Sequence, residues 1–407
     1  MKRTLLLILL SVLSVSTVFS KERKTVIVIM DGVSMDVIER LHVPVIYDIA
    51  SKGGFAANYV GGQPGTYTET PTISAVGYNT MLTGTWANKH NVFGNSNLKP
   101  NYNYWSIFRI AKEQQSPVST AVFTGWTDNR TVLLGHKKEE NASMDIDYIY
   151  DGYDKDKERF PKKEYHLEVS DFDEAVSEDA AKCIREDAPD LSWVYFWFTD
   201  SAGHQFGDGE FFDEHVLKTG KQIEKVWEAV KYREKNFDEE WLIVVLTDHG
   251  RTMNGRSHGR QSDRERSSWI AMNRKPNAYF KSGAAAMVDV NPTVCEYMGF
   301  EVPLEVRREQ DGISLIGKTE IRDLRLSQYD KKVILRWKAE SKSAPVKIYV
   351  AKANDYKTTG SEYWTLLGEV KAGEERFEAD LNSIGESDFY KFVVEGEHDT
   401  LNRWFKN

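Results

Sequence analysis

The sequence predicts an α/β fold built on a parallel sheet, followed by a smaller β-sandwich. Three short, nearly continuous apolar runs are typical of strands covered on both faces, and they read TVIVIM at 25–30, WVYFWFT at 193–199 and LIVVLT at 242–247. Amphipathic stretches with helical spacing lie between these runs, at 173–186 and 213–232. Strands that alternate with helices along a chain usually pair in parallel, so we expect one sheet with helices on its faces.

The pattern changes after about Ser314. Apolar residues now alternate with polar ones, without a strong helix between the runs, at 331–338, 346–350 and 389–394. Short alternating strands with Gly-bearing turns predict a β-sandwich of about 90 residues. We place the boundary near Lys318, so that residues 21–318 form the α/β domain and 319–407 the sandwich.

Residues 1–20 are typical of a secretory signal peptide. The basic pair Lys2 and Arg3 precedes an apolar run that ends near Val18, and Ser20 suits the last position before a cleavage point. The alternative is a membrane anchor, whereas the lack of a following cysteine excludes a lipoprotein. We expect an exported protein, periplasmic or extracellular, with no transmembrane segment after cleavage.

Composition excludes several classes of protein. The 407 residues carry a net charge of -9, which argues against binding to a nucleic-acid duplex by charge alone. A mean hydropathy of -0.51 excludes a multi-span membrane protein. The two cysteines, Cys183 and Cys295, are too few for a disulfide scaffold or a cysteine zinc cluster, and their spacing does not say whether they pair.

Aspartates follow all three apolar runs of the α/β part, and histidines lie close behind two of them. In a parallel sheet the ligand site lies beyond the carboxyl ends of the strands, so we expect these side chains in one crevice. Each alone could be a helix cap or a surface histidine. Together they predict a site for zinc or a similar divalent ion, and they are Asp31, Asp200, His204, Asp248, His249 and His258.

A nucleophile is expected at another strand-to-helix junction. Ser74 could open a short helix that ends before Gly84, where its hydroxyl would lie beside free N–H groups and the positive end of the helix dipole. Both features favour a phosphate oxygen. The alternative is that Ser74 is only a helix cap, and Thr70 and Thr72 compete for the role of nucleophile.

Six motifs occur in order along the chain: VIVIMDG at 26–32, TISAVGYNTMLTGTWANKHNVFGN at 72–95, DSAGHQFG at 200–207, LTDHGRT at 246–252, SHG at 257–259 and DVNPTVCEYMGFEVP at 289–303. This set resembles the alkaline phosphatase superfamily, and within it the type I phosphodiesterase and nucleotide pyrophosphatase branch, over about residues 24–315. The resemblance implies an alkaline-phosphatase-like catalytic domain. Residues 319–407 more weakly resemble a fibronectin type III domain.

The resemblance also implies roles for single residues. It selects Ser74 as the nucleophile of a phospho-serine intermediate and gives Asn95 the task of holding a phosphoryl oxygen. Two divalent ions, with zinc the expected metal, would be held by two groups of ligands: Asp200, His204 and His258 for one, and Asp31, Asp248, His249 and the Ser74 oxygen for the other. The implied substrate is a small phosphate ester or nucleotide.

The chain departs from the family around the pocket. Serine stands where the diesterase branch usually has threonine, and Gly77–Tyr78 replaces a common Asn-His pair. Where some monoesterases have Lys-x-Arg, this chain has Asp128, Asn129 and Arg130. Arg130 is therefore a candidate substrate-binding residue, and Asp128 would repel a dianionic monoester.

These departures favour a phosphodiesterase or nucleotide pyrophosphatase. A phosphomonoesterase with the same site is the near alternative, and a catalytically dead binding protein is a more distant one. Sulfatases of the superfamily are excluded because they need a C/S-x-P-x-R motif, which neither cysteine nor the Ser74 segment provides.

Overall fold

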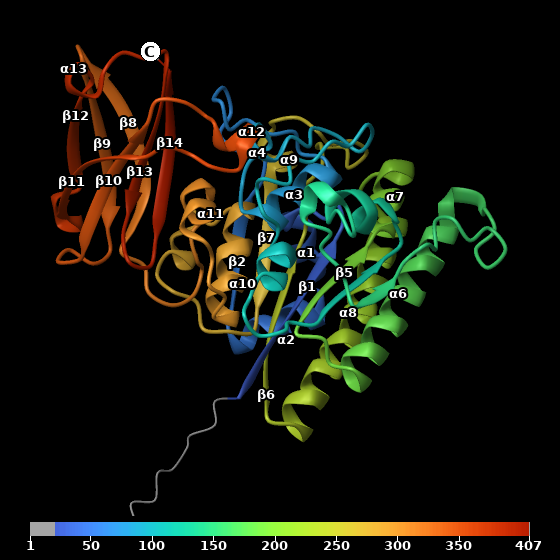
Figure 1. Cartoon of the computed structure of the whole chain (residues 1–407). Helices are drawn as coiled ribbons and strands as arrows, with labels where there is room; N and C mark the ends of the chain where they lie inside the picture. The colour runs from blue at the N-terminus through green and yellow to red at the C-terminus, as the bar shows by residue number, and fades with distance from the viewer. Residues whose placement is uncertain (1–20, 407) are drawn as a thin grey trace, which may run out of the picture.

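A seven-stranded sheet forms the centre of the larger part of the protein. The computed structural model describes residues 21–406, and Figure 1 shows this sheet with helices on both faces. Its strand order is β2 (Gly54–Tyr59), β7 (Ser267–Met272), β6 (Glu239–Leu246), β1 (Glu22–Met30), β5 (Leu191–Phe196), β3 (Thr120–Thr124) and β4 (Tyr148–Tyr150). The strands from β6 to β4 are parallel, whereas β7 pairs antiparallel with β6, and β2 pairs antiparallel with β7 at the edge. The predicted α/β fold is confirmed, with a mixed rather than wholly parallel sheet.

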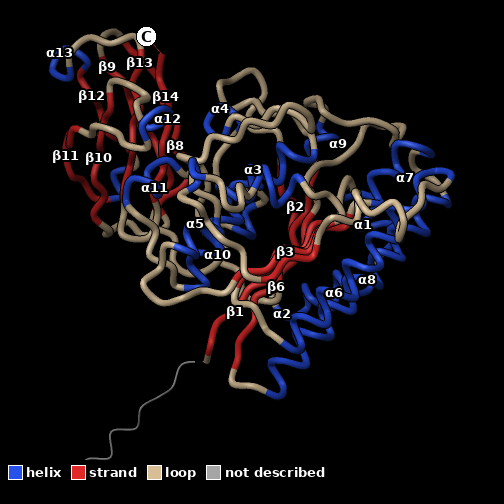
Figure 2. The backbone as a smooth tube through the Cα atoms, turned by 45° about the vertical axis from the view of Figure 1, so that its right-hand side comes forward, coloured by secondary structure: helices blue, strands red, loops and turns tan. Residues whose placement is uncertain are grey.

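The helices cover the two faces of this sheet unequally. The long helices α6 (Leu167–Glu186) and α8 (Glu210–Asn236) run side by side along one face (Figures 1 and 2). Their apolar side chains share one buried core with Val26 and Val28 of β1, whereas Ile27 and Ile29 lie in a second core with residues of α3 and α10. Burial on both faces explains why this strand reads as a continuous apolar run.

The remaining helices are shorter. They are α1 (Met35–Leu41), α2 (Pro44–Lys52), α3 (Ser74–Thr83), α4 (Ala87–His90), α5 (Ile107–Lys112), α7 (Phe198–Phe206), α9 (Asp263–Arg266), α10 (Val290–Met298), α11 (Leu304–Glu309), α12 (Tyr356–Thr359) and α13 (Leu381–Ile384). Single turns of other helix types are η1 (Asn129–Leu133), η2 (Glu139–Asn141), η3 (Glu164–His166), η4 (Phe280–Ser282), η5 (Met287–Asp289) and η6 (Ala372–Glu374).

One apolar run divides between a strand and a helix. The expected strand at 193–199 ends at Phe196, and α7 begins at Phe198. The carboxylate of Asp173 accepts hydrogen bonds from the N–H groups of Trp197 and Phe198, at 2.9 and 2.8 Å, and so caps the start of α7. Asp200 therefore lies in the first turn of a helix and not at the end of a strand.

The C-terminal part is a sandwich of two antiparallel sheets, as predicted. One sheet has the order β12 (Arg376–Asp380), β9 (Lys332–Ala339), β8 (Ile321–Tyr329), and the other has β11 (Thr365–Lys371), β10 (Pro345–Ala351), β13 (Phe389–Glu395), β14 (Thr400–Lys406). Val333, Leu335 and Trp337 point into its core, which continues through Ile321 and Leu315 into the core of the α/β part. The boundary near Lys318 stays a prediction.

Buried charges lie in the seam between the two parts. Lys89 of α4 is fully buried and donates to the Glu309 carbonyl, to Asp311 Oδ1 and to Asn402 Oδ1, at 2.7, 2.6 and 2.8 Å. Lys391 of β13 is equally buried and bonds Glu309 Oε1 at 2.6 Å across the seam. The sandwich is thus fastened to the α/β part by polar groups that have no access to water.

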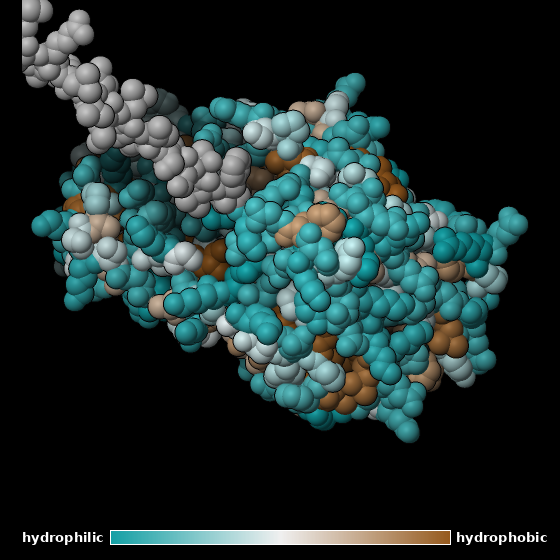
Figure 3. All heavy atoms as spheres, turned by 90° about the horizontal axis from the view of Figure 1, so that it is seen from below, coloured by the Kyte–Doolittle hydropathy of each residue, from teal (hydrophilic) through white to brown (hydrophobic). Residues whose placement is uncertain are grey.

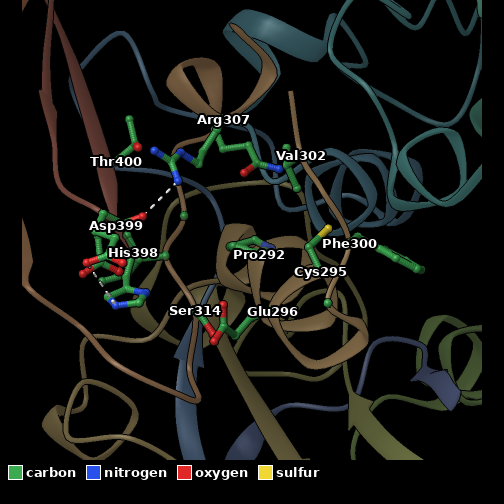
Figure 4. Close-up of a pocket in the computed structure, with 15 residues that line it drawn as sticks. Pro292, Cys295, Glu296, Phe300, Val302, Arg307, Ser314, His398, Asp399 and Thr400 are labelled. Carbon is green, nitrogen blue, oxygen red and sulfur yellow. Dashed lines mark hydrogen bonds and ion pairs between the residues drawn. The ribbon is translucent and has the colours of Figure 1, made fainter. Parts of the chain in front are cut away.

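A cavity of about 270 Å³ lies along the same seam (Figure 4). Arg307 and Glu296 line it from the α/β part, and His398 and Thr400 from the sandwich. It contains none of the predicted site residues.

The face in Figure 3 is mostly hydrophilic with small separate apolar patches, as expected for a surface that faces water. Among residues 21–406, no helix combines the length and apolar character that a membrane crossing needs. The predicted signal peptide, residues 1–20, lies outside the described residues.

Replacing Lys391 with methionine tests the seam. K391M should cost about 3–5 kcal/mol of unfolding free energy, because it leaves Glu309 and Glu362 buried together without their shared cation. Denaturant unfolding measures the loss. The matched control is K347M, at an exposed position of β10 in the same sandwich, which should change little. Equal stability of K391M and the unaltered protein would show that these charges do not hold the seam.

Candidate active site

The predicted Asp and His ligands converge at the carboxyl edge of the sheet. Asp31 follows β1 directly, whereas Asp248 and His249 follow β6 after one intervening residue. The first turns of α7 carry Asp200 and His204 four residues apart, so both side chains lie on one helix face. His258 comes from the loop after β6. These side chains form two groups that meet at Asp200.

The inner group consists of Asp31, Asp248, His249 and Ser74. His249 Nε2 lies 3.4 Å from Asp31 Oδ1, 3.4 Å from Asp248 Oδ2 and 3.2 Å from Ser74 Oγ. All four residues are buried. Their oxygen and nitrogen donors therefore surround one small volume.

The outer group consists of Asp200, His204 and His258. Asp200 Oδ2 lies 3.4 Å from His204 Nε2, Asp200 Oδ1 lies 3.6 Å from His258 Nε2, and the two imidazole Nε2 atoms are 3.1 Å apart. Ligand atoms of Asp31, Asp200 and His249 also lie within 4.8 Å of one another. Asp200 thus joins the two groups.

The donor sets fit divalent cations. Asp31 Oδ1 and Asp248 Oδ2 are buried, and neither has a hydrogen-bond partner within the described part of the chain. A buried carboxylate oxygen without a donor is costly, and a cation between the two oxygens would remove that cost. Carboxylate oxygen and imidazole nitrogen are also the usual ligands of zinc.

The electrostatics of the site agree with this fit. Burial lowers the pKa of His249 and of His258 to about 4, so both imidazoles are neutral near pH 7 and keep a lone pair for a metal. Burial raises the pKa of Asp248 to about 7 and that of Asp31 well above its usual range, and the nearby negative charge of Asp200 adds to both shifts. Bound cations would reverse that shift.

Asp200 behaves differently because an arginine lies against it. Burial works to raise the pKa of Asp200, but the His204 hydrogen bond and the Arg251 charge outweigh burial and hold the pKa well below its usual range. Arg251 Nη1 donates to Asp200 Oδ1 at 2.5 Å, and its side chain is almost fully buried. Sequence reasoning missed this arginine.

The serine helix is built as predicted. Ser74 is the first residue of α3, which ends before Gly84 in the left-handed conformation. Asn95 Oδ1 accepts the Ala75 N–H at 2.9 Å and so fixes this amide beside the helix N-terminus. Of the three candidate hydroxyls, only Ser74 contacts the Asp–His cluster, because Thr72 bonds the 259–260 backbone and Thr70 bonds the Thr68 carbonyl.

The Gly77–Tyr78 pair has a structural explanation. A Cβ atom on Gly77 would lie 2.8 Å from the Asp248 carbonyl oxygen, so glycine lets α3 approach the inner group closely. The Tyr78 hydroxyl, one helical turn beyond Ser74, donates to Asp31 Oδ2, and the Tyr195 hydroxyl donates to the same atom at 2.6 Å. Sequence reasoning missed both tyrosines as supports of Asp31. The four-residue spacing of Ser74 and Tyr78 was the available signal, because it places these two side chains on one face of α3.

A cleft of about 580 Å³ opens beside the outer group. Asn95, Asp200 and His204 line one part of it. Its other walls combine aromatic and charged side chains, namely Trp126, Phe172, Trp197, Asp154, Lys157, His166 and Glu168. A cleft of this size suits a small ester with an apolar or aromatic substituent.

Arg130 does not join the cluster. Its Nε atom donates to Asp151 Oδ2 at 2.6 Å, and it is not among the residues that line the cleft. Its role in substrate binding stays a prediction.

The fold is shared with solved enzymes of low sequence identity. A 2-O GAG sulfatase is 13% identical with a TM-score of 0.53, over 89% of this chain and 86% of that one. The phosphonate monoester hydrolase of Agrobacterium radiobacter is 13% identical with a TM-score of 0.51, over 94% of this chain and 89% of that one. None of the curated proteins matches the chain.

These likenesses show the fold alone. The class comes from a family model, and it is a phosphoester hydrolase of the alkaline phosphatase superfamily. A family model described as type I phosphodiesterase / nucleotide pyrophosphatase matches residues 25–362. The chain belongs to that family.

A methyl group at position 77 tests the close packing of α3 on the inner group. G77A should move the helix away from Asp248, which should cost about 1–3 kcal/mol of stability and reduce turnover by about 100-fold through misplacement of Ser74. Thermal unfolding and steady-state kinetics measure the two effects. The control is G94A, where an added Cβ meets no atom within 4 Å. Full activity of G77A would contradict this packing argument.

Proposed function

We propose that the protein is an exported phosphodiesterase or nucleotide pyrophosphatase that works with two divalent ions, expected to be zinc, through a phospho-serine intermediate. The observation that carries the proposal is the position of Ser74. Its Oγ atom lies 3.2 Å from His249 Nε2, beside the unpartnered oxygens of Asp31 and Asp248, at the N-terminus of α3. Export rests on the character of residues 1–20.

The inner group would hold one ion together with the Ser74 oxygen, and the outer group would hold the second. When bound, two such ions supply Lewis acidity for the entering and the leaving oxygen of an in-line displacement. The chain itself orients the groups. The two tyrosine hydroxyls fix Asp31, the Gly32 N–H fixes Asp248 at 3.0 Å, and Arg251 fixes Asp200.

Ser74 would attack the phosphorus atom of the bound ester. Its hydroxyl proton leaves to water, the Oγ–P bond forms, and the bond to the leaving oxygen breaks; that oxygen takes a proton from water. The amide of Asn95 faces the cleft beside the helix N-terminus, where it can donate to a non-bridging oxygen. A water molecule then attacks phosphorus and frees Ser74 with its proton restored.

The surroundings of the site favour a diester over a monoester. A monoester brings nearly one more negative charge, and the arginine expected to meet it, Arg130, is already paired with Asp151. Asp154 and Glu168 line the cleft, and Lys157 lines it too. An apolar or aromatic ester group would pack against Trp126, Phe172 and Trp197. The Ser74 segment also lacks the sulfatase motif.

We also propose that the sandwich is a fibronectin type III-like domain. Its seven antiparallel strands in sheets of three and four support this assignment.

The nucleophile is tested by replacing Ser74. S74A should lower turnover by at least about 10³-fold with little change in stability, because it removes the attacking oxygen and no helix-capping bond. T72A is the control, since the Thr72 hydroxyl bonds only the backbone of residues 259 and 260. The Thr72 carbonyl, which T72A keeps, is the atom that contacts His258 Nδ1, so T72A should lose far less. If S74A stays active while T72A does not, the nucleophile has been misassigned.

The substrate class is tested with one leaving group on two esters. We expect kcat/KM for an aryl phosphate diester to exceed that for the matching monoester by about tenfold or more on zinc-loaded protein, because the cleft offers no free arginine for the second charge. D128K should narrow the gap by improving monoester turnover, whereas K347M should not. A tenfold preference for the monoester would favour the phosphomonoesterase alternative and leave Ser74 in its role.

A further inference from the structure

The three buried carboxylates of the site are each held through one oxygen, but not by the same kind of donor. Asp31 Oδ2 accepts from two neutral tyrosine hydroxyls, and Asp248 Oδ1 accepts from the neutral Gly32 N–H. Asp200 Oδ1 accepts from a guanidinium, which carries a full positive charge at any pH that the protein meets. The outer group is therefore the one whose carboxylate is paired with a positively charged side chain of the protein.

The fold provides a fitted slot for this guanidinium. Arg251 Nε donates to the Gly255 carbonyl at 2.5 Å. A Cβ atom on Gly203 would lie 2.5 Å from Arg251 Cζ, and one on Gly32, whose φ is +67°, would lie 2.7 Å from Nη1. Two glycines from different elements thus leave the space that the arginine fills. Its Nε and Nη1 atoms are thus held by hydrogen bonds, whereas its Nη2 atom is buried without a partner among the described residues.

The formal charges of the two groups differ as a result. When both are ionised, as a bound cation would favour, Asp31 and Asp248 give the inner group two negative charges, with neutral His249 and Ser74. In the outer group the single charge of Asp200 is cancelled by Arg251, and His204 and His258 supply imidazole nitrogens. The outer group is also open to water, since the His204 side chain is 43% exposed and that of His249 is 0%.

We propose, on the basis of the two-ion function above, that Arg251 makes the two ion sites unequal. By cancelling the charge of Asp200 and occupying one of its oxygens, it lowers the affinity of the outer group for a divalent cation. The outer ion is then the exchangeable one, and it keeps more of its positive charge for the ester oxygens. The inner ion binds more tightly because two uncompensated carboxylates face it.

Zinc titration of the metal-free protein, with a competing chelator, tests this assignment. We expect two classes of site whose dissociation constants differ by about tenfold or more. H204A should abolish the weaker class and leave the tighter one, since it removes a half-exposed ligand of the outer group alone. R251Q keeps a neutral donor near Asp200, as the other two carboxylates have, and should tighten the outer site by about tenfold. R251K, which keeps the charge, should leave the outer site weak.

Each outcome separates this inference from the proposed function. If the unaltered protein binds no zinc or a single ion, the two-ion function fails. If it binds two ions and H204A removes the tighter one, or R251Q weakens the outer site or leaves it unchanged, then Arg251 does not set the difference and the two-ion function stands. The H204A result decides the order of affinities even where R251Q fails to fold, which thermal unfolding of the metal-free variants reveals.

Discussion

Mutual repulsion among three buried carboxylates is the constraint on which the rest of this site depends. Asp31, Asp200 and Asp248 meet at one sheet edge with almost no access to water, where unpaired negative charge is unfavourable. The protein offsets part of that cost with its own donors: two tyrosine hydroxyls, the Thr247 hydroxyl, one backbone N–H and one guanidinium. The oxygens left without donors then mark where positive charge from outside is needed.

This constraint also explains residues that touch no substrate. Gly77 lets the serine helix lie against Asp248, and Gly32 and Gly203 leave the slot for Arg251. Each glycine is required by the approach of another group and not by a turn alone. The departures of this chain from its family's pattern, Gly77 and Tyr78 above all, are therefore part of how its carboxylates are held in place.

The sequence was enough to predict the α/β class, the sandwich and the Asp–His cluster, because apolar runs mark buried strands and the ends of parallel strands share one edge. The sequence did not predict where β5 ends and α7 begins. Asp200 lies inside α7 because Asp173, which is distant in sequence, caps that helix. Arg251 reads as a loop arginine, since its slot is made of residues from three separate segments. The antiparallel edge strands and the Arg130–Asp151 pair depend equally on long-range packing.

The sandwich is connected to the carboxylate site through Lys89. The helix α3 carries Ser74, and the short turn after it leads to α4, whose Lys89 is held by Asp311 and by Asn402 of the sandwich. Asp311 also accepts the Trp86 N–H at 3.0 Å, and its own N–H donates to the Gly84 carbonyl at 2.7 Å. The C-terminal end of the serine helix is thus tied to the seam by contacts independent of the ions. A rigid seam would keep α3 against the carboxylates even when the outer ion exchanges, so the sandwich contributes to the geometry of a site that none of its residues enters.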